Sequence, residues 1–111
     1  MKTKFITLIL CILFSTTVLA DRAEFCDSMA RMGLKYISDR QDGKFLSNVI
    51  SDIKSLNTEH DKLSYDVENA AIEMAERAYE YPMYSDKDQQ TRIKVKFMNE
   101  VYNECLNLKT N

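Results

Sequence analysis

The pattern of apolar and polar positions divides residues 21–111 into four segments with helical periodicity. The clearest segment is 85–108, where apolar residues recur at steps of three and four. Ser85 is suited to cap its first turn, and Asp88 stands three residues later, as in a capping box. We therefore predict a helix over 85–108 whose inward stripe is Ile93, Phe97, Val101, Cys105 and Leu108.

Two earlier segments show a single apolar face each. The first, 22–40, places Cys26, Met29, Ala30, Gly33 and Ile37 on one side. A glycine in mid-helix lowers helix propensity, so close approach of a neighbouring helix is the expected reason for Gly33. After a turn at Asp42-Gly43, the second segment, 44–56, has an apolar arc made of Phe45, Leu46, Val49, Ile50, Ile53 and Leu56.

The remaining segment, 61–81, is apolar on two opposite sides. Its expected inward stripe is Leu63, Val67, Ala70, Met74, Ala78 and Tyr81, while Tyr65, Ile72 and Tyr79 project the other way. Pro82 ends the helix because it lacks a backbone N–H and restricts the residue before it. A helix with two apolar sides is either central to its domain or has a partner outside it.

No stretch alternates between apolar and polar residues for long enough to predict a strand. Four helices joined by short polar turns predict an all-α, antiparallel four-helix bundle with up-down-up-down topology. Residues 21–111 are expected to form one domain.

Residues 1–20 have the features of a secretory signal peptide. Lys2 and Lys4 precede an apolar run, and small residues lead to a cleavage site after Ala20. The run is short for a transmembrane helix, and Leu10 before Cys11 does not fit a lipoprotein signal. The protein is therefore expected to be periplasmic or secreted, with no membrane attachment after cleavage.

Export would place the two cysteines of the mature chain in an oxidising compartment. In an up-down-up-down bundle the start of the first helix lies beside the end of the fourth, so we predict a Cys26–Cys105 disulfide. The alternative is a redox or metal pair. The chain has no Cys-x-x-Cys motif, and His60 is its only histidine.

Charge and residue types narrow the possible functions. Residues 21–111 contain 13 Lys and Arg against 17 Asp and Glu, with both signs intermixed, which argues against nucleic acid or anionic lipid as a partner. No nucleophile with a base, phosphate-binding glycine loop or cluster of metal ligands is recognisable. The acids Glu73, Glu76 and Glu80 are expected to be a solvated helix face. We predict that the protein is not an enzyme and needs no cofactor.

The most suggestive surface is the outer side of segment 61–81 with the residues that follow it. We predict binding of a protein partner, or self-association, as for an inhibitor, immunity protein or chaperone. The residues expected to make this contact are Tyr65, Ile72, Tyr79, Tyr81, Met83 and Tyr84. In a competing interpretation, they only close the end of the bundle or are covered by another segment.

A second functional hypothesis is a carrier of a small ligand or of copper. The thioethers of Met29 and Met32 are soft ligands that suit Cu(I), although core packing accounts for both residues as well.

The early Cys26, the Arg40-Gln41-Asp42-Gly43 turn, the helix end at Tyr79 to Pro82 and the late Cys105 together resemble small exported bacterial or phage proteins with two cysteines, whose function is uncharacterised. The resemblance spans most of residues 21–111. It implies a small exported helical domain and assigns no activity.

Overall fold

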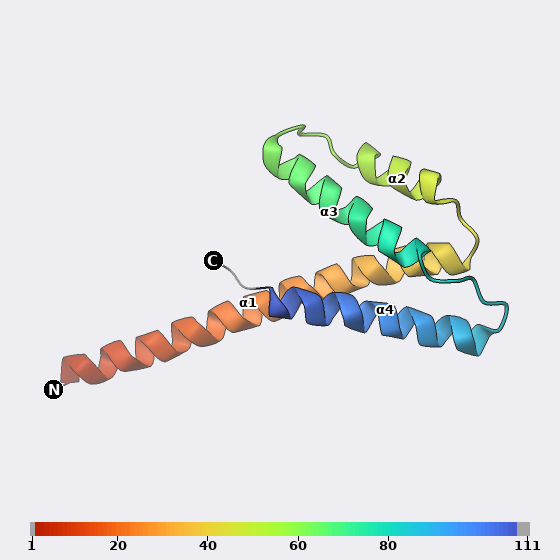
Figure 1. Cartoon of the computed structure of the whole chain (residues 1–111). Coiled ribbons are helices and arrows are strands. Elements are labelled where there is room, and N and C mark those ends of the chain that lie inside the picture. The colour runs from red at the N-terminus through yellow and green to blue at the C-terminus, as the bar shows by residue number, and fades with distance from the viewer. Residues whose placement is uncertain (1, 109–111) are drawn as a thin grey trace.

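The computed structural model describes the backbone of residues 2–108 and the side chains of residues 21–108. Its four helices are α1 (Lys2–Gln41), α2 (Leu46–Ser55), α3 (Lys62–Tyr79) and α4 (Lys87–Asn107). Successive helices run antiparallel (Figure 1). No strand occurs within residues 2–108. The prediction of an all-α, antiparallel four-helix fold is confirmed.

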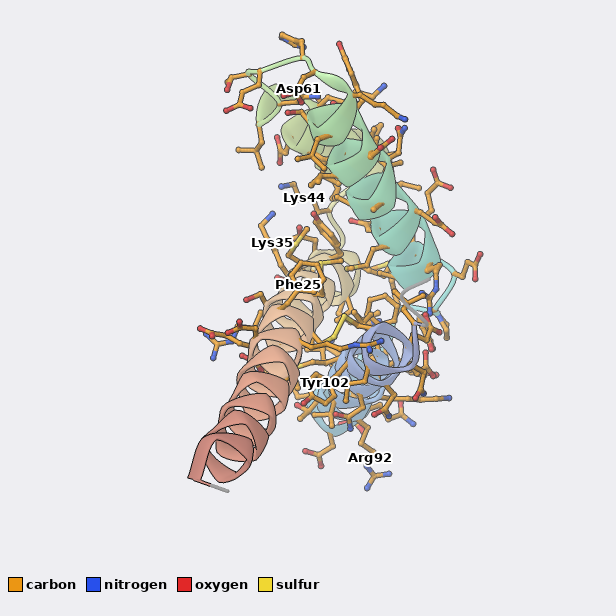
Figure 2. The ribbon with its side chains drawn as sticks, turned by 90° about the vertical axis from the view of Figure 1, so that its left-hand side faces the viewer. Phe25, Lys35, Lys44, Asp61, Arg92 and Tyr102 are labelled. Atoms are coloured by element: carbon orange, nitrogen blue, oxygen red, sulfur yellow. A yellow bond between two sulfur atoms is a disulfide. The ribbon has the colours of Figure 1, made fainter. Side chains whose placement is uncertain are left out.

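The helices are arranged as two pairs. Helix α4 packs along α1 in the most extensive contact of the molecule, and α2 and α3 form a hairpin that also rests on α1. The axis of this hairpin diverges from α1 toward the turn between α2 and α3 (Figure 1). Figure 2 shows the same divergence from another side, with Asp61 near the far end of the hairpin and Lys44 nearer α1.

All four helices contribute to one apolar core. Ile37, Val49 and Phe97, from α1, α2 and α4, are almost completely buried. Gly33 permits the close approach of α4, as predicted, because a Cβ atom at this position would lie 3.1 Å from Val101 Cγ2 and 3.3 Å from Phe97 Cε1. On α4 the predicted inward stripe is correct for Ile93, Phe97, Val101 and Cys105, whereas Leu108 is exposed.

The Cys26–Cys105 disulfide links α1 to α4, as predicted, with a Cα–Cα distance of 5.5 Å. Both cysteines are buried. Close by in sequence, the Arg22 guanidinium donates a hydrogen bond to the carbonyl oxygen of Leu108, which satisfies an acceptor at the end of α4. The bridge and this bond fix the C-terminal end of α4 against α1.

Several predicted helix boundaries need correction. Helix α1 is continuous from Lys2 instead of beginning near residue 22. Helix α2 begins at Leu46, and α3 ends at Tyr79, two residues before the predicted end. The N-cap of α4 is Asp86, not Ser85.

The inward faces of the α2–α3 hairpin also differ from the prediction. Phe45, just before α2, and Leu56, just after it, are both exposed. Leu63, Val67 and Ala70 are exposed on α3, whose buried residues are Ala71, Met74, Ala75 and Ala78. The hairpin diverges from α1 toward its turn, which leaves Leu56, Leu63 and Val67 without a covering helix.

The predicted signal peptide, residues 1–20, lies outside the residues whose side chains are described. Its cleavage stays a prediction. Within the described part of the chain, no helix combines the length and apolar character needed to cross a membrane.

Candidate functional site

Tyr79 and Tyr81, two of the residues predicted to bind a partner, make polar contacts inside the fold. The Tyr79 hydroxyl donates a 2.6 Å hydrogen bond to the carbonyl oxygen of Lys44, and the Arg40 guanidinium lies over its ring. The Tyr81 hydroxyl donates a 2.5 Å hydrogen bond to a carboxylate oxygen of Glu100. Both tyrosines are half-buried and pack against the core.

The loop after α3 is held by two residues at the end of α1. The buried Gln41 amide donates to the Pro82 carbonyl oxygen at 2.8 Å and accepts from the Tyr84 backbone N–H at 2.9 Å. The Arg40 Nε–H donates to the Tyr81 carbonyl oxygen at 3.0 Å. Sequence reasoning missed Gln41, because its two partners lie about 40 residues away.

The six predicted contact residues therefore do not form one exposed surface. The prediction that Ile72 lies on the outer side of the helix was wrong. Ile72 is half-buried and packs against the core, although it lies opposite the expected inward stripe. Tyr84 also packs against the core. Of the six, only Tyr65 and Met83 are exposed, at 44% and 51%, and they lie near opposite ends of the segment. Partner binding through these two stays a prediction.

The environment of Tyr81 gives a measurable pH dependence. Burial, followed by the hydrogen bond to Glu100, raises the pKa of Tyr81 to about 12. Because an unfolded tyrosine titrates near pH 10, the native state holds this proton more tightly. The resulting stability is fully present below about pH 10 and is lost as the pH rises toward 12.

We expect Tyr81→Phe to make the loss of stability between about pH 10 and 12 shallower, because the substitution keeps the ring and removes the titrating hydroxyl. Burial also raises the pKa of Tyr36 and Tyr79, so part of the slope should remain. Urea unfolding at a series of pH values measures the slope. An identical slope in both proteins would contradict the assignment.

An open apolar groove lies where the hairpin diverges from α1. Its volume is about 370 Å³. Residues from α1, from α2, from the turn after it and from α3 line the groove: Met32, Tyr36, Ile53, Leu56, Asn57, Thr58, Glu59, Leu63, Ser64, Val67, Glu68 and Ala71. Leu56, Leu63 and Val67 are 80%, 72% and 58% exposed, so the groove presents three large aliphatic side chains to solvent.

One side of the groove is formed by the first turns of α3, which begin at the N-cap Asp61. Asp61 caps α3 by accepting a 2.7 Å hydrogen bond from the Ser64 backbone N–H, which fixes the first turn that carries Leu63. Tyr36 of α1 and Ile53 of α2 also line the groove, and both are buried core residues. The groove therefore combines exposed aliphatic residues with residues of the packed core.

Among residues 21–108, the only charged groups that line the groove are two carboxylates, Glu59 in the turn before α3 and Glu68 on α3. Neither forms a salt bridge with another described residue within 4.0 Å. The groove is thus lined mainly by apolar residues, with two negatively charged residues among them.

Three residues were considered for metal binding: Met29, Met32 and His60. Met29 and Met32 are half-buried and pack against the core. His60 is exposed, with its Nδ1 atom 3.2 Å from the Tyr65 hydroxyl. Within the residues whose side chains are described, no three His, Cys, Asp or Glu residues are grouped so that they could hold a metal ion.

Comparison of the chain with protein-family models, curated proteins and solved structures finds no match. The resemblance to small exported two-cysteine proteins stays a prediction. The geometry of the groove is therefore the basis for a functional proposal.

Proposed function

We propose that this protein is an exported, non-catalytic helical protein that binds a protein partner in the groove formed by α1, α2 and α3. The observation that carries the proposal is the exposure of Leu56, Leu63 and Val67 around one hollow. A contiguous apolar surface of this kind is typical of an interaction site, whereas single exposed aliphatic residues are ordinary.

The energetics favour a partner that fills this groove. Fully burying one Leu or Val side chain is worth about 1.5–3 kcal/mol, so three of them provide substantial stabilisation against the cost of association. Affinity is usually concentrated in a few such anchors at the centre of an interface. Tyr36 and Ile53, which also line the groove, are buried in the core and so are already ordered before binding.

The site of action is proposed to be the periplasm or the extracellular space. The predicted signal peptide supports export, and the buried Cys26–Cys105 disulfide suits an oxidising compartment.

A small-ligand carrier is the second candidate, because the groove volume of about 370 Å³ falls within the range of small-molecule pockets. A carrier should retain an apolar ligand through purification. Native mass spectrometry of the protein purified from its host would detect the mass of a bound ligand.

We expect Leu63→Asp to reduce partner affinity at least tenfold while changing the free energy of unfolding by no more than about 0.5 kcal/mol. Leu63 is 72% exposed and lies in the first turn of α3, where an added carboxylate also interacts favourably with the helix dipole. The measurement is photocrosslinking in the producing host from a benzophenone amino acid at position 56.

A matched control places the same photocrosslinking group at position 95, an exposed valine on α4 outside the groove. A discrete protein adduct should form from position 56, disappear with Leu63→Asp and be absent from position 95. The proposal is wrong if the adducts from positions 56 and 95 are the same or if Leu63→Asp leaves them unchanged.

A further inference from the structure

We propose that the segment that docks in this groove is a basic amphipathic helix of the partner, with its apolar face inside and Lys or Arg side chains beside Glu59 and Glu68. This inference rests on the proposed function and identifies the chemistry of the partner.

The helical form follows from what the groove offers. All three walls are helices and the turn between two of them, so no sheet edge is present among the lining residues to pair with an extended strand. A helix satisfies its own backbone hydrogen bonds and presents apolar side chains at steps of three and four, which suits a groove lined by Leu56, Leu63 and Val67.

The positive charge proposed for the partner follows from the acidic residues that line the groove and from the acidic character of α3. Segment 59–80 contains seven Asp and Glu residues against two Lys and Arg residues. One of these bases, Arg77, is already held by two hydrogen bonds to the Glu104 carboxylate at 2.7 and 2.8 Å. The other base, Lys62, is exposed and forms no salt bridge within residues 21–108, so the segment keeps a net negative charge that a basic segment would meet.

Two basic residues outside this segment, Lys44 and Lys35, are each paired with an acidic residue. Lys44 Nζ lies 2.7 Å from an Asp52 carboxylate oxygen, and Lys35 Nζ lies 3.7 Å from Asp39. Glu59 and Glu68 have no such partner within residues 21–108. These two carboxylates are thus the groups on the groove available to Lys or Arg of a docked helix.

Three synthetic peptides of about 18 residues test the inference, since this length allows a helix to form on docking. Each carries the same leucine stripe, and the other face is Lys and Ala, Gln and Ala, or Glu and Ala. Fluorescence anisotropy against the full, disulfide-bonded protein measures affinity. We expect the Lys peptide to bind most tightly and the Glu peptide most weakly, with the difference shrinking as salt rises.

The double variant Glu59→Gln/Glu68→Gln should weaken Lys-peptide binding about three- to tenfold and leave Gln-peptide binding unchanged. The matched control is Glu73→Gln/Glu76→Gln, which removes the same charge from exposed positions of α3 outside the groove lining. This control should retain nearly the full Lys-peptide affinity. Equal losses in both double variants would mean general attraction to an acidic surface and would overturn the inference.

The remaining outcomes separate the two proposals. If the Lys and Gln peptides bind equally and Leu63→Asp abolishes both, the groove binds a helix but its basic character is wrong. If peptide binding does not depend on Leu63, the proposed function fails as well. Preferential uptake of a fluorescent fatty acid, or self-association that Leu63→Asp abolishes, would identify a different occupant and overturn the basic helix.

Discussion

Replacing Phe97 by alanine is expected to lower the free energy of unfolding by about 3–5 kcal/mol. Phe97 is completely buried in α4, and its ring faces Gly33 of α1. The ring of Tyr81 meets it edge-on, with centroids 5.6 Å apart and planes inclined by 75°. Because Gly33 has no side chain that could fill the vacated space, truncation should leave a cavity.

The matched control is Phe45→Ala, the same change at a residue that is 74% exposed before α2. It should alter the free energy of unfolding by no more than about 0.5 kcal/mol. Urea unfolding of the disulfide-bonded protein, followed by circular dichroism, compares the two variants. Equal effects of the two substitutions would contradict the position of α4 against α1.

The sequence predicts α4 and its contact with α1 well. Helix α4 keeps one face against α1, so a single stripe at steps of three and four identifies Ile93, Phe97 and Val101 as buried. Gly33 is informative for a related reason, because a glycine in mid-helix has a cost that close packing offsets. The two cysteines then fix which helix ends meet.

The groove could not be predicted in the same way. Periodicity shows that Leu63 and Val67 share a face of α3, but it does not show where a neighbouring helix stops covering that face. The predicted inward face is correct for Met74 and Ala78. The other buried positions, Ala71 and Ala75, are small and carry a weak hydrophobic signal, so the pattern does not identify them. Divergence of the hairpin is a property of tertiary packing, and no local pattern encodes it.

The sequence left two interpretations of the tyrosines open because a tyrosine has an apolar ring and a polar end. Tyr79 and Tyr81 bury part of their rings while their hydroxyls donate to groups 35 and 19 residues away. Only the folded chain brings those acceptors close. The sequence therefore allowed two interpretations, and the structure favours closure of the bundle end for these two residues.

Removal of the Cys26–Cys105 disulfide by Cys26→Ala/Cys105→Ala is expected to lower the free energy of unfolding by about 2–5 kcal/mol. The cysteines are 79 residues apart, and constraint of so long a loop in the unfolded chain corresponds to about 4.5 kcal/mol in the chain-entropy model. Alanine is preferred to serine here because both positions are buried and would leave a hydroxyl without a partner. Thermal and urea unfolding measure the effect.

The position of the bridge also predicts where its loss acts in the native state. It joins α1 to the end of α4, whereas the groove is formed by residues of α1, α2, α3 and the turn between α2 and α3. Amide hydrogen exchange should therefore increase most in the last turns of α4, around residues 101–107, and less in the buried part of α3 around Ala75. Uniform acceleration in α3 and α4 would show that the bridge acts through global stability alone. An unchanged unfolding midpoint, together with two free thiols in the denatured, unreduced parent protein, would show that the bridge does not form.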